Sequence, residues 1–152
     1  MSYHTPFKKL SKAGEFQVER TRVFAETFLT YAGESDLCGC PYKVTEWLMK
    51  YIWRPLFGTG FFDETVGKFR RQYRRALIGV HRSFGKSQLA ACLVLTIATM
   101  DAIPNGQYGI VADSKPNTAT VKGYIATIIK ANPTLNAQWK VYKDVIRNEQ
   151  TG

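Results

Sequence analysis

The chain has 152 residues, of which 45% are hydrophobic and 13% aromatic, and this composition excludes a disordered polar chain. The 21 Lys and Arg exceed the 12 Asp and Glu and give a net charge of +9. This excess indicates an anionic partner, nucleic acid first, or a soluble basic protein with scattered lysines, and composition alone does not decide between the two. The longest apolar run, residues 89–100, is too short to span a bilayer, and no secretory signal precedes it.

The N-terminal third predicts helices. Residues 1–17 are polar and basic, and we expect a mobile arm there. Apolar residues recur at helical spacing over residues 18–32 and again over residues 44–52, in a second amphipathic helix that should stop near Pro55. Residues 57–67 contain three glycines and predict a loop.

The three cysteines fall into two groups. Cys92 lies inside an apolar helical pattern, which is typical of a small core residue. Cys38 and Cys40 have the wrong spacing for a zinc knuckle and no second pair to complete one. An odd number of cysteines without a secretory signal indicates a reducing compartment.

The most informative stretch begins with a short apolar run, residues 76–80, which predicts a buried strand. A loop ending in Gly85, Lys86 and Ser87 follows, and then an apolar helix to about residue 100. A phosphate-binding loop needs this order, because the helix offers free N–H groups and a partial positive charge to an anion. Gly85 permits close approach, Lys86 can reach the β- and γ-phosphates, and the Ser87 hydroxyl can bind Mg²⁺.

A second strand and helix follow. Residues 108–112 predict a strand, Ser114 can cap the next helix, and Asn132 followed by proline should end it. Strand, helix, strand and helix in this order predict a parallel sheet. Residues 139–147 predict a third extended segment, and the chain stops in a turn-like stretch, so we expect it to be the front part of a longer protein.

The loop departs from the usual phosphate-binding pattern, because Val80 occupies the position of the first glycine and Arg82 lies three residues before Gly85. This arrangement resembles the Walker A variant of tailed-bacteriophage terminase large subunits. The resemblance covers about residues 18–150. The other matching segments, in family order and spacing, are residues 20–28, 39–41, 47, 54–58, 70–78, 108–113 and 132–135.

The resemblance implies an α/β fold, with an incomplete P-loop NTPase-like parallel sheet preceded by an α-helical lid. The expected domains are a basic arm over residues 1–17, a lid over residues 18–68, and the first part of the ATPase domain over residues 69–152. The Walker B segment and catalytic glutamate would follow Gly152, and a nuclease domain would lie further on. Asp113 is an alternative Mg²⁺ ligand, although Ser114 follows it where Walker B would have a glutamate.

The resemblance also implies ATP and Mg²⁺ as cofactors. Arg82 would stabilise transition-state charge in cis and Lys86 would bind the transferred phosphate, which makes these two the catalytic residues. Ser87 would bind the metal. The residues expected to bind nucleotide are Arg82, Ser83, Phe84, Gly85, Lys86, Ser87, Gln88 and Trp47. The family pairs its tryptophan with a glutamine, but Leu48 stands there, so Trp47 either stacks on the base or packs in the core.

The parent protein would be the ATP-hydrolysing motor that translocates viral double-stranded DNA into a capsid, and it would also be a nuclease. Its implied partners are DNA, the portal protein and the small terminase subunit, in a homo-oligomeric ring docked on the procapsid in the host cytoplasm, with no membrane. The 152-residue chain alone is expected to be inactive, because the remaining catalytic groups would lie outside it.

Two alternatives remain open from the residues. One is another P-loop nucleic-acid motor or helicase-like ATPase, which does not need Arg82. The other is a non-enzymatic basic binding module with a vestigial loop. A basic cluster interleaved with Tyr73 is either a DNA contact or a solvated face. Its members are Lys68, Arg70, Arg71, Arg74 and Arg75.

Overall fold

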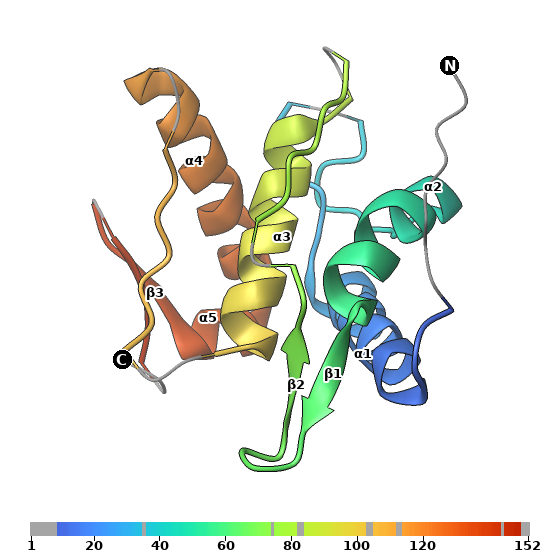
Figure 1. The fold of residues 1–152 in the computed structure, drawn as a ribbon. Coiled ribbons are helices and arrows are strands. Elements are labelled where there is room, and N and C mark those ends of the chain that lie inside the picture. Colours follow the sequence, from blue (N-terminus) through green and yellow to red (C-terminus); the bar gives the residue numbers. More distant parts are fainter. Residues whose placement is uncertain are drawn as a thin grey trace. The chain divides into compact units, whose positions relative to one another are not determined.

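The computed structural model describes residues 9–34, 36–73, 75–81, 84–102, 105–111, 114–143 and 145–149. These residues form a mixed α/β protein with five α-helices, one π-helix and two separate antiparallel hairpins (Figure 1). The chain divides into two compact units. Unit 1 comprises Met1–Val23 with Val44–Gly79, and unit 2 comprises Phe24–Lys43 with Val80–Gly152.

The first helix, α1 (Lys12–Phe28), begins earlier than the predicted residue 18 and ends earlier than residue 32. Ser11 explains the start, because its Oγ accepts a hydrogen bond of 3.1 Å from the Gly14 N–H and so caps the helix. The capping serine lies within the stretch that the sequence indicated as an arm, and its residue type alone does not distinguish a cap from a polar tail.

The second predicted helix consists of a short turn, α2 (Glu46–Leu48), and a π-helix, η1 (Met49–Gly58). The expectation that it stops near Pro55 is wrong, since the π-helix includes Pro55 and ends at Gly58. Proline omits one N–H donor, and the wider π-helical turn accommodates that loss where an α-helix would be broken. The core of unit 1 is formed by Val18, Val44, Leu48, Ile52, Trp53 and Phe57.

A β-hairpin replaces the loop predicted over residues 57–67. Strand β1 (Gly60–Asp63) pairs with β2 (Lys68–Arg71), in a register that places Gly60 opposite Arg71 and Asp63 opposite Lys68. The turn forms because Asp63 Oδ1 accepts a hydrogen bond of 3.0 Å from the Thr65 N–H, and Gly67 takes a positive φ of 63°. An Asp at the start and a Gly at the end of the turn were the signals for this hairpin.

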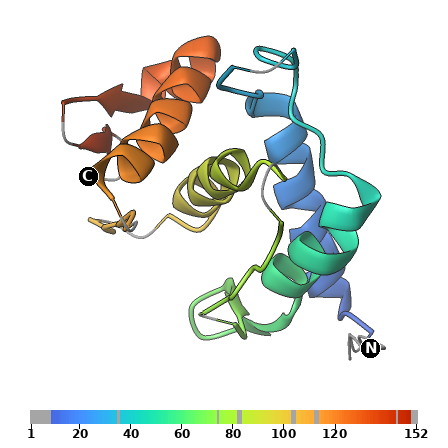
Figure 2. The same cartoon turned by 90° about the horizontal axis from the view of Figure 1, so that it is seen from above.

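Unit 2 contains the two long helices that the sequence predicted. Helix α3 (Lys86–Met100) packs against α4 (Lys115–Ala131), and the two lie side by side in Figure 2. The predicted caps are confirmed, since the Ser114 side chain accepts from the Asn117 N–H and Asn132 ends α4 and caps α5 (Pro133–Gln138). The core of this unit is formed by Phe24, Ala25, Leu29, Leu89, Cys92, Leu95, Ile125, Ile128, Ile129, Leu135 and Trp139.

A second hairpin follows α5. Strands β3 (Trp139–Val141) and β4 (Ile146–Asn148) pair antiparallel, with Trp139 opposite Asn148. The prediction of one extended segment over residues 139–147 is therefore wrong, because the chain reverses between residues 141 and 146 and pairs with itself. Trp139 is buried at the start of the hairpin and ties it to the core.

The expected parallel sheet is wrong, since the strands of the described residues form only the two hairpins. Residues 75–81 and 105–111 have no regular secondary structure. Leu77 is fully exposed and Val111 is 95% exposed. A strand requires hydrogen-bonded neighbours, and local apolar character does not supply them. Part of the second predicted strand, Ala112, lies outside the described residues.

The close approach of α1 to η1 in unit 1 yields a stability prediction. Gly14 is buried, and a Cβ at this position would overlap the carbonyl oxygen of Gly58. We expect Gly14→Ala to lower the free energy of unfolding by about 1–3 kcal/mol, because backbone cannot yield to an added methyl group. Urea denaturation followed by circular dichroism measures the change.

Gly123→Ala is the matched control for this substitution. Gly123 is an exposed residue inside α4, and a Cβ there would have no atom within 4 Å. This variant should be more stable than the wild type by about 0.5–1 kcal/mol, since alanine restricts the unfolded chain. Equal stabilities of Gly14→Ala and the wild type would contradict the close approach.

Candidate phosphate-binding site

The predicted phosphate loop leads directly into helix α3. Gly85 precedes the helix with φ 80° and ψ 34°, in the left-handed region, and its carbonyl oxygen accepts the first helical hydrogen bond, 2.9 Å from the Leu89 nitrogen. Within the described part of the chain, no atom would crowd a Cβ on Gly85, and its left-handed backbone conformation is the feature that favours glycine. The helix starts at Lys86, which confirms its predicted position to within one residue.

The N-terminus of α3 carries the positive end of the helix dipole. Among the described residues, no side chain accepts a hydrogen bond at the cap position, and the first turn contains no acidic residue. Lys86 is exposed and adds a full positive charge where the helix dipole is already positive. A cation at this end costs a helix about 0.3–1 kcal/mol. Helix stability therefore does not explain Lys86, and N–H groups at the start of a helix are the kind of group that binds anions in proteins.

The residues before Gly85 are described only in part. Phe84 donates its N–H to the His81 carbonyl oxygen over 3.4 Å, and the two rings meet edge to face with centroids 5.7 Å apart. Arg82 and Ser83 lie outside the described residues, and so does the alternative metal ligand Asp113. The catalytic role of Arg82 and the nucleotide-binding role of Ser83 stay predictions. Ser87, the predicted metal ligand, is half-buried in the first turn of α3.

Gln88, one of the predicted nucleotide-binding residues, directs its side chain into the protein interior. Its Oε1 accepts a hydrogen bond of 2.8 Å from the Ala32 N–H. Its Nε2 donates to the Thr30 carbonyl oxygen at 3.0 Å and to Cys92 Sγ at 3.1 Å. These bonds occupy the amide, so what Gln88 offers to a phosphate is its backbone N–H. Of these three contacts, the sequence indicates only the one between Gln88 and Cys92, through their i, i+4 spacing on a helix.

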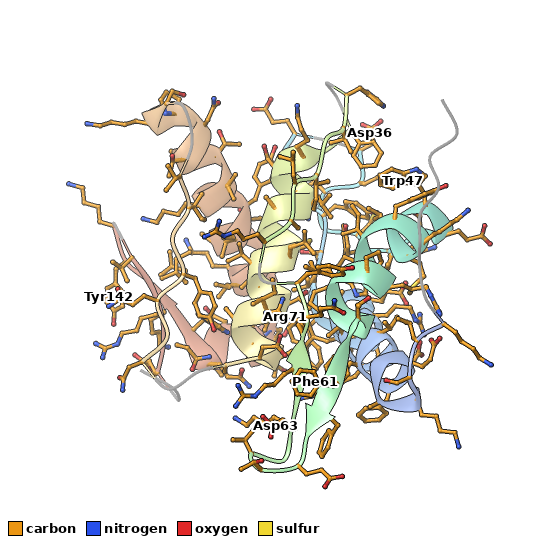
Figure 3. The ribbon with its side chains drawn as sticks, viewed as in Figure 1. Asp36, Trp47, Phe61, Asp63, Arg71 and Tyr142 are labelled. Carbon is orange, nitrogen blue, oxygen red and sulfur yellow. The ribbon has the colours of Figure 1, made fainter. Side chains whose placement is uncertain are left out.

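Trp47 lies on the surface of unit 1. Its side chain is 42% exposed, and its ring centroid is 5.3 Å from that of Tyr51, which the Lys50 ammonium approaches to 5.1 Å (Figure 3). The interpretation of Trp47 as a core residue is therefore wrong. Two partly exposed rings beside a cation can bind a flat aromatic group by stacking.

The basic cluster before the predicted first strand is partly engaged within unit 1. Arg70 pairs with Asp63 at 2.6 Å, and the Arg71 guanidinium lies 6.0 Å from the centroid of the Phe57 ring (Figure 3). Lys68 and Arg75 are exposed. Arg74 lies outside the described residues. Contacts within unit 1 therefore account for Arg70 and Arg71 without a DNA contact, whereas Lys68 and Arg75 are exposed to solvent.

A small hollow lies in unit 1, away from the predicted site residues. A hollow of about 170 Å³ in unit 1 contains none of the predicted site residues and is lined by Tyr51, Ile52, Pro55, Leu56, Tyr73, Arg75, Ala76, Leu77 and Ile78. Within the described ranges, no group of three or more His, Cys, Asp and Glu side chains is placed to hold a metal ion. None of the helices in these ranges has the length and apolar character needed to cross a membrane.

Comparison with known proteins leaves the site to be interpreted from its own chemistry. The chain gives no match to protein-family models, to curated proteins or to solved structures.

The Gln88 side chain yields a prediction about stability. In Gln88→Ala, the buried Ala32 N–H and the Thr30 carbonyl would both lose their partner. We expect the free energy of unfolding to fall by about 1–3 kcal/mol, because an unpaired buried polar group keeps its full desolvation cost. Thermal and urea denaturation measure it. Gln107→Ala, at an exposed glutamine of the same unit, should leave the stability unchanged. Similar stabilities of the two variants would contradict this role.

Proposed function

We propose that the chain provides the nucleotide-binding, N-terminal part of an ATP-driven DNA-packaging motor of the terminase large-subunit type. The loop formed by residues 80–87 binds the phosphates of Mg²⁺-ATP at the start of α3. Lys86 contacts the β- and γ-phosphates, Ser87 binds the metal, and Arg82 stabilises the transferring phosphoryl group. The parent protein hydrolyses ATP to translocate double-stranded DNA.

One observation carries this proposal. An exposed lysine is the first residue of α3, and a left-handed glycine immediately precedes it. The first turn contains no acidic residue, and no side chain of the described residues caps it. This combination concentrates N–H donors and positive charge at one point, and phosphate is the common biological anion that such a point fits. The arginine-bearing loop sequence resembles that of terminase large subunits. This resemblance favours a nucleotide as the bound anion and a terminase-type motor as the parent protein.

The exposed cations of unit 1 support a DNA partner. Lys68 follows a hairpin turn whose first strand exposes Phe61 and Phe62 to 59% and 52%. Cations neutralise phosphates, and exposed aromatic rings add contact with sugar or base. The alternative of a non-enzymatic basic module rests on the same residues. An experiment on nucleotide binding by the phosphate loop therefore has to distinguish the two functions.

Binding of Mg²⁺-ATP to the 152-residue chain and to Lys86→Ala tests the nucleotide part. We expect the wild type to bind and Lys86→Ala to bind roughly ten- to a hundredfold more weakly, since a charge-assisted hydrogen bond contributes about 1.5–3 kcal/mol. Isothermal titration calorimetry measures both dissociation constants.

Lys115→Ala is the matched control for the nucleotide experiment. Lys115 is also exposed and is also the first residue of a long helix, but Ser114 caps that helix. Its removal should leave ATP binding unchanged. Equal binding by the wild type and Lys86→Ala, or no binding by either, would sink the proposed phosphate site in this chain and favour the non-enzymatic module.

Salt dependence tests the DNA part. For the double variant Lys68→Ala, Arg75→Ala, we expect weaker binding to duplex DNA and a slope of log K against log salt reduced by about 2, one for each lost phosphate contact. Fluorescence anisotropy over a salt series measures the slope. The control double variant Lys130→Ala, Lys140→Ala removes the same charge from exposed positions of unit 2. An equal loss in both variants would indicate non-specific charge rather than contacts by unit 1.

A further inference from the structure

Two exposed thiols lie at the tip of a loop in unit 2. Cys38 and Cys40 are both exposed and free, and Gly39 between them takes a positive φ of 84° (the neighbouring Asp36 is labelled in Figure 3). We call residues 36–42 the thiol loop. The left-handed glycine bends the backbone between the two cysteines, which are only two residues apart in the chain.

Backbone hydrogen bonds hold the thiol loop in this bend. The Tyr31 N–H donates to the Cys40 carbonyl oxygen and the Gly39 N–H donates to the Tyr31 carbonyl oxygen, both over 2.9 Å. The Cys40 N–H donates to the Leu37 carbonyl oxygen over the same distance. These bonds to Tyr31 and Leu37 hold the backbone of Gly39 and Cys40 in place.

The base of the thiol loop is also anchored. Thr30 and Pro41 form an antiparallel bridge, and the rings of Tyr31 and Tyr42 have centroids 5.1 Å apart. Gln88 of α3 binds the backbone on either side of Tyr31. An anchored loop has little conformational entropy left to lose when its two thiols are linked.

The sequence separation places the two cysteines within bridging range. Residues i and i+2 are at most about 7 Å apart in a fully extended chain, and a bend shortens this distance. Disulfides join residues with Cα atoms about 4.4–6.8 Å apart. The ring that a bridge between Cys38 and Cys40 closes is small, so we expect a bond that is easily reduced again.

The third cysteine is chemically separate from this pair. Cys92 is fully buried, and burial raises the pKa of its thiol to about 12, with the Gln88 hydrogen bond opposing the shift. It remains a neutral thiol at physiological pH, and the thiolate is the reactive form. Cys38 and Cys40 therefore provide the accessible thiol chemistry of the chain.

We propose that Cys38 and Cys40 form a dithiol site that exchanges with small-molecule disulfides of the glutathione class. One cysteine attacks a sulfur of oxidised glutathione, which forms a mixed disulfide and releases one glutathione thiol. The other cysteine attacks the protein sulfur of that mixed disulfide and releases the second glutathione. Two protein thiols are oxidised to one intramolecular disulfide, and one glutathione disulfide is reduced to two thiols.

A glutathione redox series on the 152-residue chain tests the proposal. The protein is equilibrated at increasing ratios of oxidised to reduced glutathione, quenched with acid, alkylated and analysed by peptide mass spectrometry. We expect Cys38 and Cys40 to lose alkylation together, with no glutathione retained and no disulfide bond formed between two chains. Cys92 should stay unmodified in the native protein and become alkylated after unfolding, which makes it an internal control.

The single variants Cys38→Ser and Cys40→Ser provide the second arm. Each removes the resolving thiol, so the remaining cysteine should retain one glutathione under conditions that fully oxidise the wild type. Both positions are exposed, so the fold should tolerate serine. Glutathione retained on both cysteines of the wild type, disulfide-linked dimers, or thiols that stay reduced throughout the series would each overturn the proposal.

Discussion

The hydrogen bonds of the Gln88 amide are the interaction on which unit 2 depends most. This one side chain joins α3 to the backbone of Thr30 and Ala32, residues that are far from it in sequence. It does so in the interior, where its donor and acceptor both find partners and the desolvation cost is therefore offset. The same contact fixes the base of the thiol loop beside the first turn of the helix that carries the candidate phosphate site.

Helix α3 explains why this connection matters. Its interior positions from Leu89 to Ala98 are mostly buried, so the helix is packed on more than one side and not only against α4. A helix held in this way keeps its N-terminal N–H groups in fixed positions. Such preorganised donors lose little conformational entropy when they bind an anion. At the N-terminal end of α3, Lys86 is exposed and Ser87 is half-buried.

The two apolar segments that predicted a sheet show the limit of local patterns. Leu77 and Val111 have the residue types of buried strand, yet both are almost fully exposed. Apolar character only makes burial favourable, whereas pairing requires a neighbouring backbone with free N–H and C=O groups in register. In each hairpin, the partner strand lies only a few residues away along the chain. The turn formed by Asp63 and Gly67 brings β1 and β2 together, although the glycine-rich stretch had predicted a loop.

The sequence by itself determined the features that depend on neighbouring residues. These were the helical span of α3, the caps at Ser114 and Asn132, the burial of Cys92, and the glycine and lysine at the start of a helix. Only the tertiary structure decided that Gln88 points inward and that Trp47 lies on the surface. It also decided that the strands pair as local hairpins. Helix caps and helical periodicity depend on a few adjacent residues and can therefore be recognised in the sequence. Side-chain direction and strand pairing depend on partners that the local sequence does not specify.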